Sequence, residues 1–182
     1  MAQFGLVSGL FSIFSNLYAA EYVAPLEALV IESISHVNYS GYSVSSGIAL
    51  GGAISGDDDS TIMLRNNGTV EFHGNSVCSS SFRYASEGAA IYGGSNSTIL
   101  LSNNEAVHVC CNSSMRGDSV YGFGAICGYT NSTIKLINND VLSFDDNIGG
   151  AIYGYNGSTI TLDNNSNISF NRNTAESAGA IC

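Results

Sequence analysis

The chain has 182 residues, with 5 Lys and Arg against 15 Asp and Glu, which gives a formal net charge of -10. This length predicts one domain. The shortage of basic residues argues against nucleic-acid binding, because few side chains are present to neutralise phosphates. Hydrophobic residues make up 45% of the chain and charged residues 11%, which is the reverse of a disordered composition. One Pro beside 21 Gly excludes a collagen-like repeat.

The first 20 residues are apolar and carry no charged side chain. They end in small residues at Ala19 and Ala20, which predicts a secretory signal peptide over residues 1–20, although no basic residue precedes the apolar stretch. The alternative is a buried N-terminal helix or cap that closes one end of the core. We expect residues 21–46 to form an N-terminal cap or a degenerate coil, and residues 47–182 to form a repeat region.

A glycine-rich element of the type Gly-Gly-Ala-Ile recurs five times. Its copies are Gly51-Gly52-Ala53-Ile54, Gly88-Ala89-Ala90-Ile91, Gly124-Ala125-Ile126, Gly149-Gly150-Ala151-Ile152 and Gly179-Ala180-Ile181. In the first four copies a Ser-Thr-Ile triplet, an Asn-Asn pair, an apolar-x-apolar step and a final Asn follow at fixed distances. From Ile54 to Asn75 the separation is 21 residues, and it is the same in the other three copies. This spacing predicts one structural unit that repeats.

Each block alternates apolar and variable residues, as around Ile62 and Leu64, which is the period of a strand with one buried face. Each block holds three such short strands. One block is too small to bury its own apolar face, but blocks stacked on one another can form a continuous core. The sequence therefore predicts an all-β fold, a right-handed single-stranded parallel β-helix of about four coils plus a partial fifth. A β-propeller needs about 40 residues per blade, whereas only 26 separate Ile126 from Ile152.

Stacked coils place equivalent residues in columns. We expect an inner column of Ile62, Ile99, Ile134 and Ile160, and a corner column of Asn67, Asn104, Asn139 and Asn165. Asparagine tolerates the left-handed backbone of a sharp corner, and its amide can bond the next coil. These asparagines are therefore interpreted as structural.

The connections between blocks are long over residues 75–88 and 112–124. Insertions of this kind protrude from one side of a solenoid and are a usual place for binding. We expect a contact surface there, made by Cys78, Phe82, Arg83, Tyr84, Met115, Arg116 and Tyr121. Tolerated insertions without a partner are the alternative. On the same reasoning, deletion of part of residues 76–87 is expected to be mild.

The five cysteines have no Cys-x-x-Cys spacing, which offers no support for a zinc ribbon. Cys127 and Cys182 occupy equivalent positions two coils apart, and a rise of about 9.6 Å exceeds the reach of a disulfide. Cys110 or Cys111 could instead pair with Cys78, one coil below.

Candidate calcium and catalytic sites lack a full set of ligands or catalytic side chains. Asp57-Asp58-Asp59 and Asp145-Asp146 suggest a calcium site, but no second oxygen cluster accompanies them, so a solvated corner is the preferred interpretation. The basic residues and histidines are scattered along the chain and form no pattern of a catalytic site. We therefore expect no enzyme activity, no cofactor and no metal, because a β-helix fold alone does not make an enzyme.

The Gly-Gly-Ala-Ile element alternates with a Phe-x-x-Asn tetrapeptide. The tetrapeptide reads Phe72-His73-Gly74-Asn75, Phe144-Asp145-Asp146-Asn147 and Phe170-Asn171-Arg172-Asn173. Over about residues 47–182 this pattern resembles the polymorphic membrane proteins of chlamydiae, although similar repeats occur in surface proteins of some protists. The second copy departs from the motif, with Val109-Cys110-Cys111-Asn112, and three of the five glycine elements are imperfect.

The resemblance implies an autotransporter passenger domain at the bacterial outer membrane or cell surface, or in secreted form. Such a domain would act as an adhesin toward a host-cell receptor or glycan. Association with the outer membrane would depend on a C-terminal barrel that this sequence lacks. The resemblance assigns adhesion to Gly51, Gly52, Ala53, Ile54, Phe72, Asn75, Phe144, Asn147, Gly149, Gly150, Ala151, Ile152, Phe170 and Asn173. The alternatives are a β-helix enzyme that processes polysaccharide, and a truncated non-functional product of a variable gene family.

Overall fold

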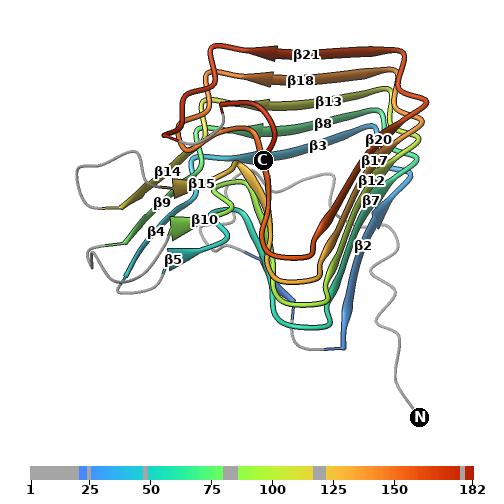
Figure 1. Ribbon diagram of the computed structural model, residues 1–182. Coiled ribbons are helices and arrows are strands. Elements are labelled where there is room, and N and C mark those ends of the chain that lie inside the picture. The colour runs from blue at the N-terminus through green and yellow to red at the C-terminus, as the bar shows by residue number, and fades with distance from the viewer. Residues whose placement is uncertain (1–20, 24–25, 47–48, 80–85, 117–121, 177–178) are drawn as a thin grey trace.

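The computed structural model describes residues 21–23, 26–46, 49–79, 86–116, 122–176 and 179–182, and the predicted signal peptide lies outside these ranges. The described part of the chain contains 21 strands and no helix. All pairings between these strands are parallel. Each strand pairs with its equivalent in the next coil, so the chain winds as a parallel β-helix (Figure 1). The predicted fold class is confirmed.

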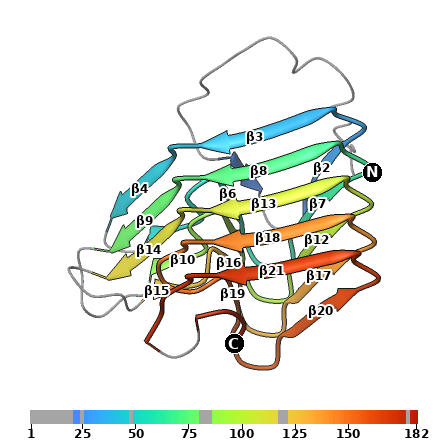
Figure 2. The ribbon, with the colours of Figure 1, turned by 90° about the horizontal axis from the view of Figure 1, so that it is seen from above.

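Three sheets of five strands run through the stack of coils. The first contains β1 (Glu21–Val23), β6 (Ile54–Gly56), β11 (Ile91–Gly93), β16 (Ile126–Gly128) and β19 (Ile152–Gly154). The second contains β2 (Ala28–Glu32), β7 (Thr61–Arg65), β12 (Thr98–Ser102), β17 (Thr133–Ile137) and β20 (Thr159–Asp163). The third contains β3 (His36–Ser40), β8 (Thr69–His73), β13 (Ala106–Cys110), β18 (Val141–Asp145) and β21 (Asn167–Asn171), which lie side by side in Figure 2.

Two sheets of three strands occupy the connections between blocks. One contains β4 (Ser43–Ser46), β9 (Ser76–Ser79) and β14 (Ser113–Arg116), and the other β5 (Ala49–Leu50), β10 (Ser86–Glu87) and β15 (Gly122–Phe123). Val77, Ala49 and Ala89 form a second small core there. The prediction that residues 75–88 and 112–124 are loops outside the strands is therefore wrong for the described part of both segments, although these strands do extend to one side of the coils (Figure 1). A deletion that reaches these strands removes paired and buried residues, so a mild effect is no longer expected.

In-register pairing places equivalent side chains in columns. The second sheet pairs Ile62 with Ile99, Ile99 with Ile134, and Ile134 with Ile160. The first three of these side chains are fully buried, and Ile160, in the last coil, packs partly buried against the same core. The predicted apolar column is confirmed.

Two ladders of asparagine side chains join the coils at the inner corners. Asn139 is typical: its Oδ1 accepts bonds from the backbone N–H and the Nδ2 of Asn104 at 3.1 and 3.0 Å, and its Nδ2 donates to the Leu101 carbonyl oxygen at 3.0 Å and to Asn165 Oδ1 at 3.0 Å. The Asn139 amide thus uses both of its hydrogens and two acceptor positions. The predicted column is confirmed. The second ladder consists of Asn75, Asn112, Asn147 and Asn173.

In the first ladder the left-handed corner itself belongs to the residue that precedes each asparagine. These residues are Asn66, Asn103, Asn138 and Asn164, with φ between 51° and 56°. Asparagine is enriched in this region of the Ramachandran plot. The two roles that the sequence suggested for one asparagine are therefore divided between two neighbours.

Residues 21–46 continue the β-helix with the same register. Their strands β1 to β4 pair with β6 to β9. Tyr39 stacks on Phe72 with ring centroids 5.3 Å apart, and Phe144 stacks on Phe170 at 5.0 Å. Val109 separates the two aromatic pairs because it occupies the same column between Phe72 and Phe144. The first described coil therefore packs on the repeats as the repeats pack on one another.

Candidate functional site

The residues to which the resemblance assigns adhesion lie mainly inside the coils. Buried in the structure are Gly51, Gly52, Ala53, Ile54, Phe72, Asn75, Phe144, Asn147, Gly149, Gly150, Ala151 and Ile152. Phe170 and Asn173, in the last coil, are half-buried. The glycines allow close approach of coils, since a Cβ on Gly52 would meet the Ala89 carbonyl oxygen. These residues build the coil, so a partner that touches the described surface meets other side chains.

The outward positions of the third sheet change from coil to coil. Its middle outward column is Asn38, Glu71, His108, Ser143 and Ser169. The inward column beside it is Val37, Val70, Val107, Leu142 and Ile168. Repeat units keep the residues that contact neighbouring repeats and leave the outer surface free to vary. This outer face is therefore one candidate for function.

A shallow depression of about 260 Å³ lies on this outer face across β8, β13 and β18. It is lined by Glu71, His73, His108, Cys110, Ser143 and Asp145. His73 Nδ1 lies 2.9 Å from Cys110 Sγ, and His108 Nδ1 lies 2.7 Å from Ser143 Oγ. These contacts join neighbouring coils, because each pair occupies one register position.

The Cys110 thiol in this depression has a raised pKa. Burial raises the pKa of the Cys110 thiol to about 11, and the neighbouring Cys111, Asp145 and Glu71 raise it further in the same direction. A protonated thiol is a poor nucleophile.

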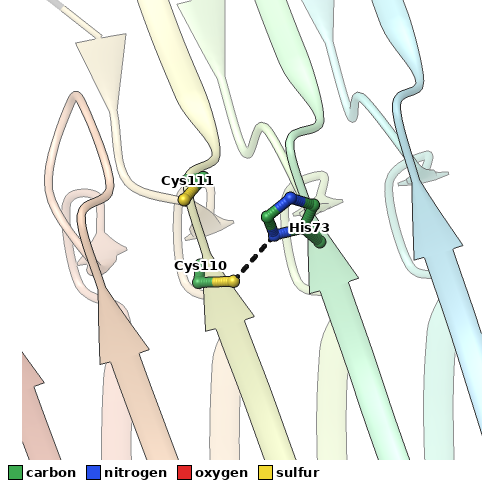
Figure 3. Close-up of side chains that lie close together, drawn as sticks. All are labelled: His73, Cys110 and Cys111. Atoms are coloured by element: carbon green, nitrogen blue, oxygen red, sulfur yellow. Dashed lines mark hydrogen bonds between the residues drawn. The ribbon is translucent and has the colours of Figure 1, made fainter.

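One group of potential metal ligands occurs among the described residues. His73, Cys110 and Cys111 each offer one ligand atom, and these atoms lie within 4.8 Å of one another (Figure 3). Thiolate sulfur and imidazole nitrogen suit zinc and similar ions. The spacing of the cysteines in the chain offered no support for zinc, and calcium was suggested only at the clustered aspartates, so this set was missed. The signal that could have found it is the register of the repeat, which aligns the two variable residues of one Phe-x-x-Asn copy with those of the next.

Four aromatic side chains gather on another side of the molecule, near β15, β16 and β19. Phe123 and Tyr153 have ring centroids 4.5 Å apart, and Tyr129 and Tyr155 stack at 5.0 Å with an interplanar angle of 2°. Tyr155 is exposed, and the other three are half-buried. Register explains the stacked pair, because Tyr129 and Tyr155 each lie three residues after the isoleucine of a glycine element.

A buried acid lies next to this aromatic cluster. Glu87 on β10 has only 7% of its surface exposed, and Cys127 Sγ lies 3.9 Å from its Oε2. Burial raises the pKa of the Glu87 carboxyl to about 7, and the Cys127 contact lowers it slightly. Burial also raises the pKa of Cys127, with the charge of Glu87 as a further cause. Glu87 is thus an acid whose charge changes near neutral pH.

All five cysteines are free thiols. Cys127 and Cys182 lie two register positions apart, with Tyr153 between them, and the prediction that they form no disulfide agrees with the structure. The suggested pairing of Cys78 with Cys110 or Cys111 is wrong. Strand β9 places Cys78 beside Met115, whereas Cys110 lies beside His73.

The predicted contact residues of the long connections divide into two groups. Cys78, Met115 and Arg116 lie in paired strands. The remaining four, Phe82, Arg83, Tyr84 and Tyr121, lie outside the described residues.

The acidic corners have structural partners. Asp58 Oδ1 accepts a bond from the Ser95 backbone N–H at 2.6 Å, and Asp59 adopts a left-handed φ of 59°. Asp146 forms a bidentate ion pair with Arg172, at 2.6 and 2.7 Å, and the hydrogen bonds from Arg172 lower the pKa of Asp146. The interpretation of both runs as surface corners agrees with these contacts.

Comparison of the chain with protein-family models, with curated proteins and with solved structures finds no match. Within the described ranges, no helix has the length and apolar character needed to cross a membrane.

Proposed function

We propose that this chain is an adhesin-like binding domain, displayed at a cell surface as the passenger of an autotransporter, that binds a partner on host cells. The observation that carries the proposal is the division between the two sides of each strand. Inward positions repeat and outward positions vary, as with Val107 and His108 on β13. A rigid scaffold with a variable outer surface is the arrangement that repeat proteins use for recognition.

The aromatic cluster of Phe123, Tyr129, Tyr153 and Tyr155 is the best contact patch on the described surface. Tyrosine is enriched at protein interfaces because it offers apolar area and a polar end with little side-chain entropy to lose. Here the rings already hold one another, with centroid distances from 4.5 to 6.5 Å. Pre-ordered rings reduce the entropy cost of binding. A sugar ring or an apolar side chain of a receptor could lie against such a patch.

Binding through surface side chains requires a rigid scaffold and no chemical reaction. The ladders of hydrogen-bonded asparagines and the buried apolar columns fix each coil relative to the next, so outward side chains keep constant separations. The Gly-Gly-Ala-Ile and Phe-x-x-Asn motifs would contribute indirectly, because their residues set the coil geometry. Replacing a motif residue would then weaken binding only to the extent that it unfolds a coil.

The test is binding of the fluorescently labelled chain to cultured animal cells, measured by flow cytometry. The double variant Tyr129→Ala, Tyr155→Ala removes the stacked pair and should lower saturable binding at least about tenfold, in line with the loss of one interface hot spot. Lys135→Ala, on the outward face of β17, is the matched control and should bind as the unchanged protein does. Removal of cell-surface glycans with glycosidases distinguishes a glycan partner from a protein receptor.

Two results would reject the adhesin proposal. Saturable binding that is absent from every cell line tested would favour the truncated non-functional product. Release of reducing ends from polysaccharides by the purified chain would favour the β-helix enzyme. Equal binding by the tyrosine variant and the unchanged protein would place the contact patch elsewhere on the outer surface.

A further inference from the structure

Two cysteines and a histidine lie together at the outer corner after β13 because the repeats are stacked in register. His73 ends β8 and Cys110 ends β13, and the two residues are partners in the sheet. Cys111 follows at the corner with a left-handed φ of 57°. Successive side chains of a strand point to opposite faces, but the left-handed residue interrupts that alternation. Both sulfur atoms therefore remain on the outer side, beside the imidazole (Figure 3).

We propose that His73, Cys110 and Cys111 bind a single Zn²⁺ ion on the outer face, as a clamp between two neighbouring coils. The proposal concerns metal binding alone and does not depend on the adhesin function. The ligand set is two thiolates and one imidazole, with a fourth position open to water or to an added ligand. Zinc sites with three protein ligands and an open position are a known class.

The distances suit this ion after small movements. A tetrahedral zinc ion with Zn–S bonds of about 2.3 Å and a Zn–N bond of about 2.0 Å holds its ligand atoms about 3.5 to 3.8 Å apart. The three ligand atoms lie within 4.8 Å of one another, and the 2.9 Å contact from His73 Nδ1 to Cys110 Sγ would have to lengthen. His73 and Cys111 are exposed and Cys110 is half-buried, so their side chains have room to rotate and lengthen this contact.

The charges around the site favour a cation. Glu71 and Asp145 line the same depression from β8 and β18, with His108 between them on β13. Both carboxylates also have partners of their own, since Glu71 Oε2 lies 3.6 Å from His36 Nε2 and Asp145 Oδ1 accepts a bond from Asn171 Nδ2 at 2.7 Å, and they add negative charge near the ligands. Zinc binds cysteine as the thiolate, so its binding displaces thiol protons. Metal affinity of cysteine sites depends on pH for this reason.

The placement of the ligands makes the ion a cross-link between coils. His73 and Cys110 are 37 residues apart in the chain and contribute from adjacent strands. Because the metal binds the folded arrangement more tightly than the separated ligands, it stabilises the β-helix by mass action. The melting temperature of the reduced protein should therefore rise when Zn²⁺ is added.

The experiment is a metal titration of the full chain in its reduced, metal-free form, with the free thiols counted before each run. Co²⁺ replaces Zn²⁺ as the spectroscopic probe, because thiolate coordination gives charge-transfer bands and a tetrahedral site gives intense visible bands. We expect one equivalent of Co²⁺ to bind, Zn²⁺ to displace it, and about two protons to appear per Zn²⁺.

Variants then assign the ligands. His73→Ala and Cys111→Ser should each lower the Zn²⁺ affinity at least about 100-fold, because even the loss of a group that only supports a ligand costs 10- to 100-fold. Cys78→Ser is the matched control: it removes another half-buried cysteine, on β9, and should leave the spectrum and affinity unchanged. Circular dichroism confirms that each variant is folded.

Three outcomes would overturn the proposal. One is the absence of stoichiometric Co²⁺ or Zn²⁺ binding by protein whose five thiols are reduced. Another is unchanged affinity in folded His73→Ala and Cys111→Ser proteins. The third is loss of binding in Cys78→Ser. None of these results bears on cell binding, so failure of the zinc site and failure of the adhesin function are separate findings.

Discussion

Equivalent inward positions of this β-helix carry the same kind of residue in successive coils, whereas equivalent outward positions carry different residues. Strand β17 shows both sides within two neighbouring residues. Ile134 is fully buried between Ile99 and Ile160, and Lys135, the next residue, is exposed between Leu100 and Thr161. An inner side chain contacts copies of itself above and below, so any change affects three layers. An outer side chain contacts mainly water, so selection there can serve binding.

The largest expected effect is a charge placed in the inner column. Ile134→Asp buries a carboxylate with no partner among apolar neighbours on both sides, and we expect it to lower the free energy of unfolding by more than about 4 kcal/mol. Urea denaturation followed by circular dichroism measures the change. A loss of less than about 1 kcal/mol, the range of surface substitutions, would show that this position is not part of the core.

The second effect tests the polar part of the interior. Asn139→Ala leaves the Asn104 backbone N–H and the Leu101 carbonyl oxygen without the partners they now have. Buried polar groups without partners cost about 1 to 3 kcal/mol each, so we expect a loss of about 3 kcal/mol. The control is Asn138→Gly, at an exposed left-handed corner. Glycine accepts that conformation, and the control should stay within about 0.5 kcal/mol of the unchanged protein.

The third prediction is an increase in the free energy of unfolding, and it concerns a charged residue that is buried although most interior residues are apolar. Glu87 is buried and has a folded-state pKa of about 7 against 4.5 for the free side chain. Because the folded state holds this proton more tightly, stability is highest below the unfolded pKa and falls as pH rises from about 4.5 through about 7. Glu87→Gln should remove that fall and raise the free energy of unfolding by about 2 to 3 kcal/mol at pH 8.

Urea denaturation of both proteins across pH 4 to 8 checks this prediction. Burial and the contact with Cys127 on β16 act on Glu87, and the charge of Glu87 in turn contributes to the raised pKa of Tyr92 on β11 and Tyr153 on β19. The control is Glu105→Gln, because Glu105 is exposed at a corner, and it should leave the pH profile unchanged. If Glu87→Gln lowers stability at pH 8, the carboxylate has a stabilising partner and its burial is not the dominant cause.

The inner side of the molecule could be predicted from the sequence, and the outer side could not. Fixed spacing from Ile54 to Asn75 and its counterparts implies equivalent repeat units, and their short length favours stacked coils over propeller blades. The sequence did not predict strands β9 and β10, because Ser76–Ser79 and Ser86–Glu87 are short and contain only one strongly apolar residue, Val77. Their burial comes from pairing with neighbouring coils, which local sequence does not record.

The candidate sites depend on register between coils rather than on motifs within one. His73 and Cys110 are far apart in the chain and become neighbours only when the repeats are aligned. The same holds for Tyr129 and Tyr155. An alignment of the repeats, read column by column, would have shown the Cys-His group from the sequence alone. The pKa of Glu87 could not have been predicted, because it follows from burial beneath side chains of other coils.

The smallest expected effect completes the comparison within β17. Lys135→Asp introduces the same residue as Ile134→Asp, one position along, and places it in water. Aspartate is a poor strand residue, so a loss of at most about 1 kcal/mol is expected. Measuring both variants by urea denaturation tests register directly, because a slip of one residue exchanges the two faces of a strand. If Lys135→Asp proved as damaging as Ile134→Asp, β17 would have to be shifted against β12 and β20, and the outward columns on which both the binding surface and the zinc site depend would lose their support.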